Sequence, residues 1–315
     1  MADVSRFGIE PIDTHYTRPG HAAAHLLMEG DQVAVVDCGT TLAVPLIVEA
    51  LTRRNLELAQ VSAIIATHIH LDHAGGAGAL LAQCPHATLY VHHVGAAHLI
   101  DPAKLSNAAT SIYGEELFGN RYGVIVPAPA ERVVAVEDSF ELQLAGRVLR
   151  FYDTPGHARH HCCIWDEKSR GVFAGDAFGI GYKELRSTEK DEPFLFPTSS
   201  PAAFDPAAME TSIMKMMELA PDYLYITHYG PVVAAPAAVA RLLDQVRGFA
   251  ALLPLLPELS NDQLAARVFA IISEAYMDYL GNEAPPAELG ELLTEDVDLN
   301  AQGIEIWGKR MWKNG

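Results

Sequence analysis

Short apolar runs rich in β-branched residues alternate with segments that have helical spacing through the first two thirds of the chain. The runs predict strands at Ala23–Leu27, Gln32–Val36, Val61–Ala66, Thr88–Val91, Arg132–Val136, Phe140–Leu144, Arg147–Tyr152, Cys163–Asp166, Gly171–Ala174 and Tyr223–Thr227. The helical spacing predicts surface helices at Val44–Arg54, Ala77–Gln83 and Pro206–Leu219. The periodicity by itself therefore indicates a mixed α and β fold.

The pattern changes after about residue 232, where the chain reads as helical. Ser260 and Gln263 have the spacing of a capping box, and apolar residues follow at helical intervals until Gly281. Trp307 and Trp312 lie near the end of the last helical stretch. We therefore divide the chain into a domain of residues 1–232 and a helical C-terminal extension of residues 233–315. The extension either packs onto the first domain or forms a homodimer surface.

An inserted segment at about residues 99–131 interrupts the alternation of strands and helices. It contains the aromatic and basic residues Tyr113, Phe118, Arg121 and Tyr122. Segments of this length are often functional. We weigh two interpretations equally, a lid or substrate wall and a packed surface excursion.

Composition narrows the class of partner. Half of the 315 residues are hydrophobic, and the formal net charge of −18, with no cluster of Lys and Arg, argues against a nucleic-acid partner. We expect a small-molecule substrate, either anionic or neutral, and no nucleic-acid partner. The N-terminal residues show no signal peptide pattern and no apolar stretch is long enough for a membrane span. The four cysteines have no CxxC spacing, so a reduced, cytoplasmic protein is the expectation.

The candidate chemistry begins in the run Ala66-Thr67-His68-Ile69-His70-Leu71-Asp72-His73, which follows an apolar strand-like stretch. Side chains two apart on extended backbone point the same way, so His68 and His70 can bind one metal ion. The following turn can bring Asp72 and His73 to a second ion. Structural zinc sites are usually closed and rich in cysteine, whereas none of these ligands is a cysteine. The pattern therefore favours a catalytic metal site.

Three more metal-binding residues follow, each at the end of a strand-like run. They are His157 in Thr154-Pro155-Gly156-His157, Asp176 after Gly175, and His228 after Thr227. The full order, HxHxDH followed by distant His, Asp and His, resembles the metallo-β-lactamase superfamily over about residues 20–232. The resemblance implies an αββα sandwich, an α/β fold in which two sheets are covered by helices.

The same resemblance assigns the ligands. One metal ion is held by His68, His70 and His157, a second by Asp72, His73 and His228, and Asp176 bridges the two. Zinc is the expected divalent metal, with iron and manganese as alternatives.

Within the superfamily, the motif context is similar to the glyoxalase II branch of thioester and ester hydrolases. We expect a dinuclear metal-dependent hydrolase that cleaves an ester, thioester or lactone with a metal-bound hydroxide, because bound metal lowers the pKa of water from 15.7 to about 7. Asp72 is a catalytic candidate for handling the leaving group, and Tyr182 is a candidate oxyanion donor. The alternatives are an iron-dependent oxidoreductase of the same fold, such as a persulfide dioxygenase or a diiron oxygen-binding protein, and a non-enzymatic metal-binding protein.

Several further residues near the motifs have two interpretations each. His160 or His161 can orient a ligand, and His21 or His25 can approach the site, although packing is the simpler interpretation for the latter pair. A basic group formed by Lys183, Arg186 and Lys190 can bind a substrate anion or remain solvated surface charge.

Overall fold

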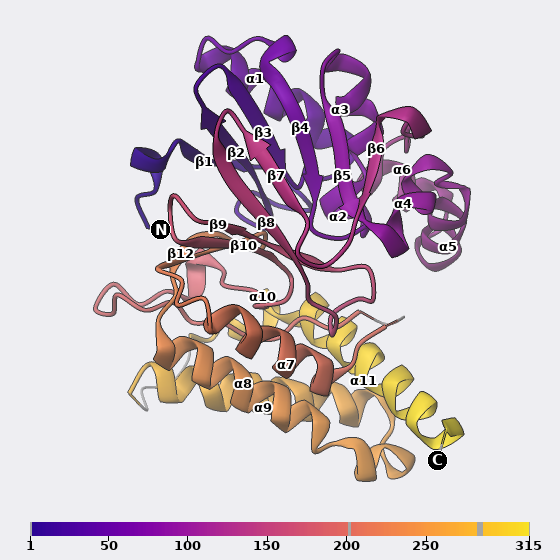
Figure 1. Ribbon diagram of the computed structural model, residues 1–315. Coiled ribbons are helices and arrows are strands. Elements are labelled where there is room, and N and C mark those ends of the chain that lie inside the picture. Colours follow the sequence, from indigo (N-terminus) through magenta and orange to yellow (C-terminus); the bar gives the residue numbers. More distant parts are fainter. Residues whose placement is uncertain (1, 201–202, 282–285, 315) are drawn as a thin grey trace. The chain divides into compact units, whose positions relative to one another are not determined.

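The computed structural model describes residues 2–200, 203–281 and 286–314, with the side chains of residues 108, 109, 112, 113 and 314 excepted, so the side chain of Tyr113 lies outside the described part (Figure 1). The chain forms two compact units. The first comprises residues 1–153, 160–175 and 221–232, and the second comprises residues 154–159, 176–220 and 233–315. The C-terminal helices thus share a unit with residues 176–220.

The first sheet contains six strands in the order β1-β2-β3-β4-β5-β6. Their bounds are Ile9–Asp13, Ala23–Glu29, Gln32–Val36, Val61–Ala66, Thr88–His92 and Val133–Val136. β1, β2 and β3 pair antiparallel, whereas β3 to β6 run parallel. The carboxyl ends of β3 and β4 therefore meet at one edge of the sheet, which is where parallel sheets commonly place ligand-binding loops.

The second sheet has the order β12-β11-β10-β9-β8-β7. Its strands are β7 (Glu141–Leu144), β8 (Arg147–Asp153), β9 (Cys162–Asp166), β10 (Gly171–Gly175), β11 (Tyr223–Ile226) and β12 (Gly230–Val233). β7 to β10 pair antiparallel, and β10 pairs parallel with β11. The parallel pair brings the segments that follow Gly175 and Ile226 to the same end of this sheet.

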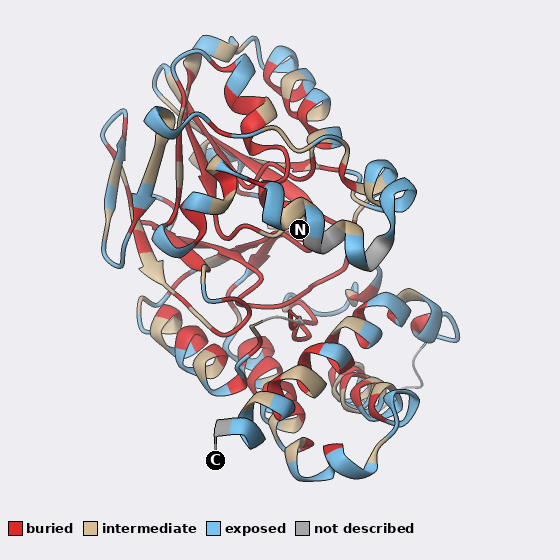
Figure 2. Cartoon of the chain, turned by 90° about the vertical axis from the view of Figure 1, so that its right-hand side faces the viewer, coloured by how far each residue is buried: buried red, intermediate tan, exposed pale blue. Residues whose placement is uncertain are grey.

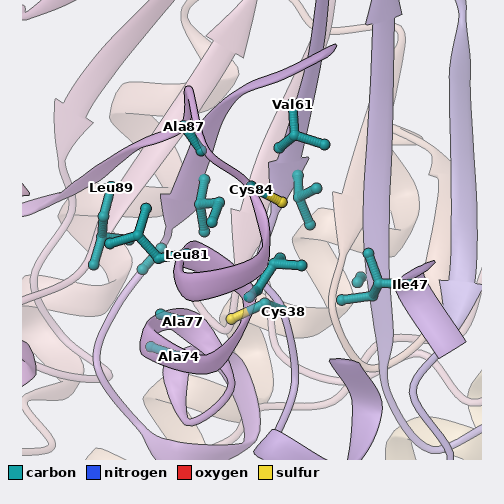
Figure 3. Packing of buried hydrophobic residues seen from close by; sticks show 14 of the residues in the cluster. Cys38, Ile47, Val61, Ala74, Ala77, Leu81, Cys84, Ala87 and Leu89 are labelled. Carbon is teal, nitrogen blue, oxygen red and sulfur yellow. The ribbon is translucent and has the colours of Figure 1, made fainter. Parts of the chain in front are cut away.

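Each strand of the first sheet serves two hydrophobic cores. Ile65 on β4 packs with Phe151 and Phe173 of the second sheet, so one core fills the space between the sheets. Ile64 faces the other way and joins a core with Ile47 of α1 (Val44–Arg53) and residues of α3 (Ala77–Gln83) (Figure 3). The central strands β3 and β4 are buried on both faces, which explains their continuous apolar runs in the sequence. Figure 2 shows buried residues in red along the strands inside the molecule.

The sequence pattern missed two strands, β1 and β12, and both lie at the edge of a sheet. Each contains a proline, Pro11 in β1 and Pro231 in β12. Proline lacks the N–H that a central strand donates, so it is confined to edges and weakens the strand signal in the sequence.

The inserted segment is helical. It contains α5 (Ala103–Tyr113) and α6 (Glu115–Tyr122), and α4 (His93–Ile100) precedes it. A short helix, α2 (Leu71–Ala74), follows β4 within the HxHxDH motif.

The second unit is built mainly from helices. They are α7 (Pro206–Met217), α8 (Pro236–Ala250), α9 (Asn261–Tyr279), α10 (Leu289–Leu292) and α11 (Thr294–Asn314). α7 and α8 begin at a proline, which lacks the N–H that the first turn leaves unpaired. The predicted capping box is confirmed, because Ser260 and Gln263 cap the start of α9 reciprocally. Among the described helices, none is long and apolar enough to cross a membrane.

Candidate metal centre

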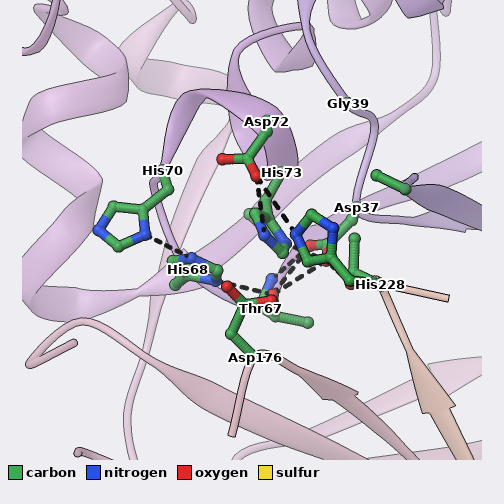
Figure 4. A network of polar contacts seen from close by, with 12 residues as sticks. Asp37, Gly39, Thr67, His68, His70, Asp72, His73, Asp176 and His228 are labelled. Carbon is green, nitrogen blue, oxygen red and sulfur yellow. Dashed lines mark hydrogen bonds and ion pairs between the residues drawn. The ribbon is translucent and has the colours of Figure 1, made fainter. Parts of the chain in front are cut away.

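The HxHxDH motif folds as a strand end followed by one helical turn. His70 keeps an extended backbone (φ −62°, ψ 148°) and α2 begins directly after it. This geometry turns His68 and His70 toward each other, and His68 Nε2 lies 2.8 Å from His70 Nδ1 (Figure 4). The two rings thus lie beside each other, as expected for residues two apart on an extended chain.

A second group lies on the other side of the motif, where His228 joins it from the end of β11. Ligand atoms of Asp72, His73 and His228 all lie within 4.8 Å of one another. Asp72 Oδ2 is 3.6 Å from His73 Nε2 and 3.3 Å from His228 Nε2. Tetrahedral coordination with bonds of about 2.0–2.1 Å separates ligand atoms by about 3.3–3.4 Å. The donor set therefore fits one divalent ion in both chemistry and spacing.

The burial of this group is uneven. The side chain of His73 is 0% exposed, whereas that of Asp72 is 19% exposed. An ion bound here would be held from the protein side and remain accessible beside Asp72. That arrangement is typical of a catalytic site, which keeps a coordination position open.

Asp37, the residue after β3, is hydrogen-bonded to His73 of the HxHxDH motif and to two nearby threonines. Its carboxylate accepts hydrogen bonds from His73 Nδ1 at 2.8 Å and from the Thr227 hydroxyl at 2.8 Å. It also accepts from the backbone N–H of Thr67 at 2.9 Å and from the Thr67 hydroxyl at 3.0 Å. The side chain is only 1% exposed, so these donors satisfy a buried charge.

The hydrogen bonds to Nδ1 decide which imidazole nitrogen can bind a metal. His73 donates through Nδ1 to Asp37, and His228 donates through Nδ1 to the carbonyl of His21 at 3.0 Å. His68 Nδ1 lies 3.2 Å from the Thr67 hydroxyl, which itself donates to Asp37. Each of these rings therefore carries its proton on Nδ1 and presents a lone pair on Nε2.

The second unit holds the two remaining predicted ligands. His157 Nε2 lies 3.4 Å from Asp176 Oδ2, and His157 Nδ1 donates to the carbonyl of Thr198 at 3.0 Å. His157 therefore carries its proton on Nδ1, like His73 and His228, and its Nε2 faces Asp176. Position 156, directly before His157, accepts only glycine, because a Cβ there would lie 2.3 Å from backbone atoms of Met209.

His160 and His161 lie in the first unit, beside the first pair of ligands. The ring of His160 stacks at 6.1 Å from His68 and meets His70 edge-on at 5.4 Å. His161 is fully buried, with its ring 5.1 Å from that of His68. Both side chains therefore pack around the predicted ligands His68 and His70.

The two N-terminal histidines differ in environment. The ring of His21 lies 5.4 Å from that of His228, and burial lowers the pKa of His21 to about 3. His25 packs edge-on against Phe173 and Tyr225, and burial lowers its pKa to about 4. His21 thus adjoins the site, whereas His25 is a core residue.

Tyr182 and the basic group belong to the second unit. The Tyr182 side chain is buried and its hydroxyl donates to Asp296 on α11 at 3.2 Å. Arg186 donates to the carbonyl of Gly181, and Lys190 lies over the ring of Tyr279 at 5.0 Å. The catalytic role of Tyr182 and anion binding by the basic group therefore both stay predictions.

The sequence reasoning missed Asp37 as a functional residue. A signal was present, because Asp37 follows the apolar run Gln32–Val36 directly, as His68 nearly follows Val61–Ala66. The rule that polar residues at strand ends gather at one sheet edge applies to it equally. The short distance from Asp37 to the motif, however, depends on the pairing of β3 with β4.

Clustered histidine and aspartate donors at strand ends of a two-sheet α/β fold define this protein as a member of a metal-binding class. The family model described as the metallo-beta-lactamase superfamily matches residues 17–228, about two thirds of the chain. The chain belongs to this superfamily, and the predicted fold class is confirmed.

Individual relatives are distant. The metallo-beta-lactamase fold-containing protein ST1585 of Sulfurisphaera tokodaii is 28% identical over 244 residues, which cover 76% of this chain and 77% of the relative. The probable metallo-hydrolase YybB of Bacillus subtilis is 28% identical over 159 residues, covering 50% of this chain and 63% of the relative. The solved metallo-beta-lactamase family protein TTHA1429 of Thermus thermophilus aligns over 98% of this chain and 94% of its own, with 20% identity and a TM-score of 0.61, a likeness of fold alone.

Proposed function

We propose that this protein is a dinuclear metal-dependent hydrolase of an ester, thioester or lactone, of the glyoxalase II-like type. The observation that carries the proposal is the group of Asp72, His73 and His228, whose ligand atoms have the spacing of a coordination shell. Superfamily membership supports hydrolysis as the reaction class.

The ligand assignment in this proposal follows the superfamily pattern. A first ion is held by His68, His70 and His157, a second by Asp72, His73 and His228, with Asp176 as the bridging carboxylate. Support comes from the 2.8 Å contact of His68 with His70 and the 3.4 Å contact of His157 with Asp176. The histidine-rich donor set favours zinc, and iron and manganese also suit imidazole and carboxylate ligands.

Divalent metal bound by these donors would supply hydroxide near neutral pH and polarise the substrate carbonyl. The side chains of this chain then have defined tasks. Asp37 keeps the proton of His73 on Nδ1, and the carbonyl of His21 does the same for His228, so that Nε2 of both rings stays available. In this proposal Asp72, whose side chain is 19% exposed, handles the leaving group. Tyr182→Phe tests the predicted oxyanion role of Tyr182, and a kcat within twofold of wild type would exclude it.

The experiment that tests the proposal combines metal content with turnover. Protein purified without chelator is analysed by plasma mass spectrometry and then assayed on ester, thioester, lactone and persulfide substrates. We expect about two zinc ions per chain and hydrolysis of at least one ester class. His70→Ala and Asp176→Asn should lose metal and turnover together, whereas the exposed His86→Ala should lose neither.

Other results would redirect the function. Iron with oxygen-dependent persulfide turnover would replace the hydrolase by the oxidoreductase alternative. Full metal occupancy without turnover on any of these substrates would favour a metal-bearing binding protein. A His70→Ala protein that retains both ions and full activity would contradict the ligand assignment itself.

A further inference from the structure

The C-terminal end of α6, in the inserted segment, lies against the loop between β1 and β2. The hydroxyl oxygens of Tyr16 and Tyr122 are 3.2 Å apart, and their rings lie 6.1 Å apart. The guanidinium of Arg121 lies over the ring of Tyr16, 5.6 Å from its centroid. Tyr122 is buried, whereas Tyr16 and Arg121 are partly exposed. Two segments about a hundred residues apart thus form one polar and aromatic surface.

This surface adjoins the second group of metal ligands. The ring of Tyr16 lies 5.2 Å from His21, and the ring of His21 lies 5.4 Å from His228. Burial raises the pKa of Tyr16 well above its ordinary value, and the negative charge of Asp72 raises it further. The phenol therefore stays protonated and keeps a hydroxyl donor close to the site.

The end of α6 is fixed in place by short contacts. The Thr41 hydroxyl is 2.8 Å from the carbonyl of Val124 and 3.1 Å from the carbonyl of Gly75, which follows α2. Gly123 has a left-handed φ of 70°, and a Cβ there would lie 3.2 Å from a methyl of Leu42. The position of α6 is therefore tied to the helix that carries Asp72 and His73.

We infer that Tyr16, Arg121 and Tyr122 form a recognition subsite for a carboxylate on the substrate, beside the metal ligands Asp72 and His228. This inference rests on the proposed hydrolase function and narrows its substrate to carboxylate-bearing esters or thioesters. A guanidinium with a hydroxyl donor beside it matches a carboxylate, since one of the two tyrosine hydroxyls donates to the other. A chain with a net charge of −18 repels anions at long range, and a cation at this position offsets that repulsion for an anionic substrate.

The test uses two pairs of substrates that differ only in replacing the carboxylate by its neutral isostere. The first pair, 4-acetoxybenzoate and 4-acetoxybenzamide, carries the difference on the leaving group. The second pair, phenyl 4-carboxybenzoate and phenyl 4-carbamoylbenzoate, carries it on the acyl group. The variants are Arg121→Gln, Arg121→Lys and, as control, Arg53→Gln on α1, an exposed arginine paired with Glu49.

We expect Arg121→Gln to raise KM for the carboxylate of at least one pair about 10-fold to 100-fold, since that is the effect of losing a hydrogen bond to a charged group. The amide partner should change less than twofold, and Arg121→Lys should restore part of the preference. Equal effects on carboxylate and amide in both pairs would overturn the inference and leave Arg121 as a packing residue over Tyr16.

Calorimetric binding of terephthalate to the metal-loaded protein separates this inference from the proposed function. If the wild type hydrolyses none of the four esters, the hydrolase proposal loses support, but terephthalate binding still reports on the subsite. Binding that weakens in Arg121→Gln and not in Arg53→Gln supports it. Terephthalate binding that is absent from the wild type, or unchanged in Arg121→Gln, refutes the subsite whatever the hydrolysis results.

Discussion

Replacing Asp37 by asparagine should weaken metal binding although Asp37 is not itself a proposed ligand. The substitution keeps the size of the side chain but replaces one carboxylate oxygen by an NH₂ group. If the remaining oxygen continues to accept from the backbone N–H of Thr67, the new NH₂ faces His73 Nδ1 and the Thr227 hydroxyl. The threonine hydroxyl can rotate and accept. His73 can avoid the clash of donors only by moving its proton to Nε2, the ligand atom.

The expected size of the effect follows from this tautomer change. Losing a partner that orients a ligand typically costs about 10-fold to 100-fold in metal affinity, or about 1.4–2.8 kcal/mol. The metal-free protein should also lose about 1–3 kcal/mol of unfolding free energy, because a buried donor lacks its acceptor. His68 is affected through the Thr67 hydroxyl, which places the result in the upper part of the range.

The assay is a zinc titration in competition with a chromophoric chelator, with urea unfolding of the metal-free protein alongside. Asp222→Asn is the matched control, since that aspartate is 58% exposed and pairs only at the surface with Arg170. Asp37→Asn with the zinc Kd of the wild type and of this control would refute the proposed role of Asp37.

Three further predictions follow from the same structure. Gly175→Ala should lower the free energy of unfolding in urea by about 1–3 kcal/mol, because a Cβ at this position, where φ is 48°, would lie 2.6 Å from Thr67 Oγ1. The control Gly119→Ala, with open space around it, should be neutral or stabilising, and equal effects of the two substitutions would contradict the prediction. Zinc at 100 times its Kd should raise the free energy of unfolding by about 2.7 kcal/mol. His228→Ala should lower the zinc affinity, so the same zinc concentration should stabilise this variant less. Equal stabilisation of the variant and the wild type by zinc would exclude His228 as a ligand. Because burial lowers the pKa of His25 to about 4 in the folded chain, the unfolded chain binds the extra proton below about pH 6.5. The stability of the wild type relative to His25→Gln should therefore fall by about 2 kcal/mol between pH 6.5 and 4.5; a constant difference would contradict a buried neutral His25.

Within the inserted segment, the sequence left a lid or wall and a packed excursion as equal alternatives. The structure makes α6 a helix whose last residues contact Tyr16, a residue with no motif context in the sequence. Contacts between segments a hundred residues apart depend on the fold as a whole, so no local pattern predicts them.

The sequence by itself determined the local part of this protein. His68, His70, Asp72 and His73 lie on one strand end and one helical turn, so their spacing alone keeps these side chains close together. The apolar runs likewise predicted most strands, because strands buried on both faces need no partner to be recognised.

The tertiary structure decided how these ligands are oriented. Asp37 reaches Thr67 because parallel pairing sets Val36 opposite Ile65, and it reaches Thr227, 190 residues away, because β11 ends at the same place. Hydrogen bonds of this kind depend on strand register and sheet order, which are global properties of the chain. They put the proton on Nδ1 of His73, and through Thr67 on Nδ1 of His68, so that Nε2 of each ring can serve as a metal ligand.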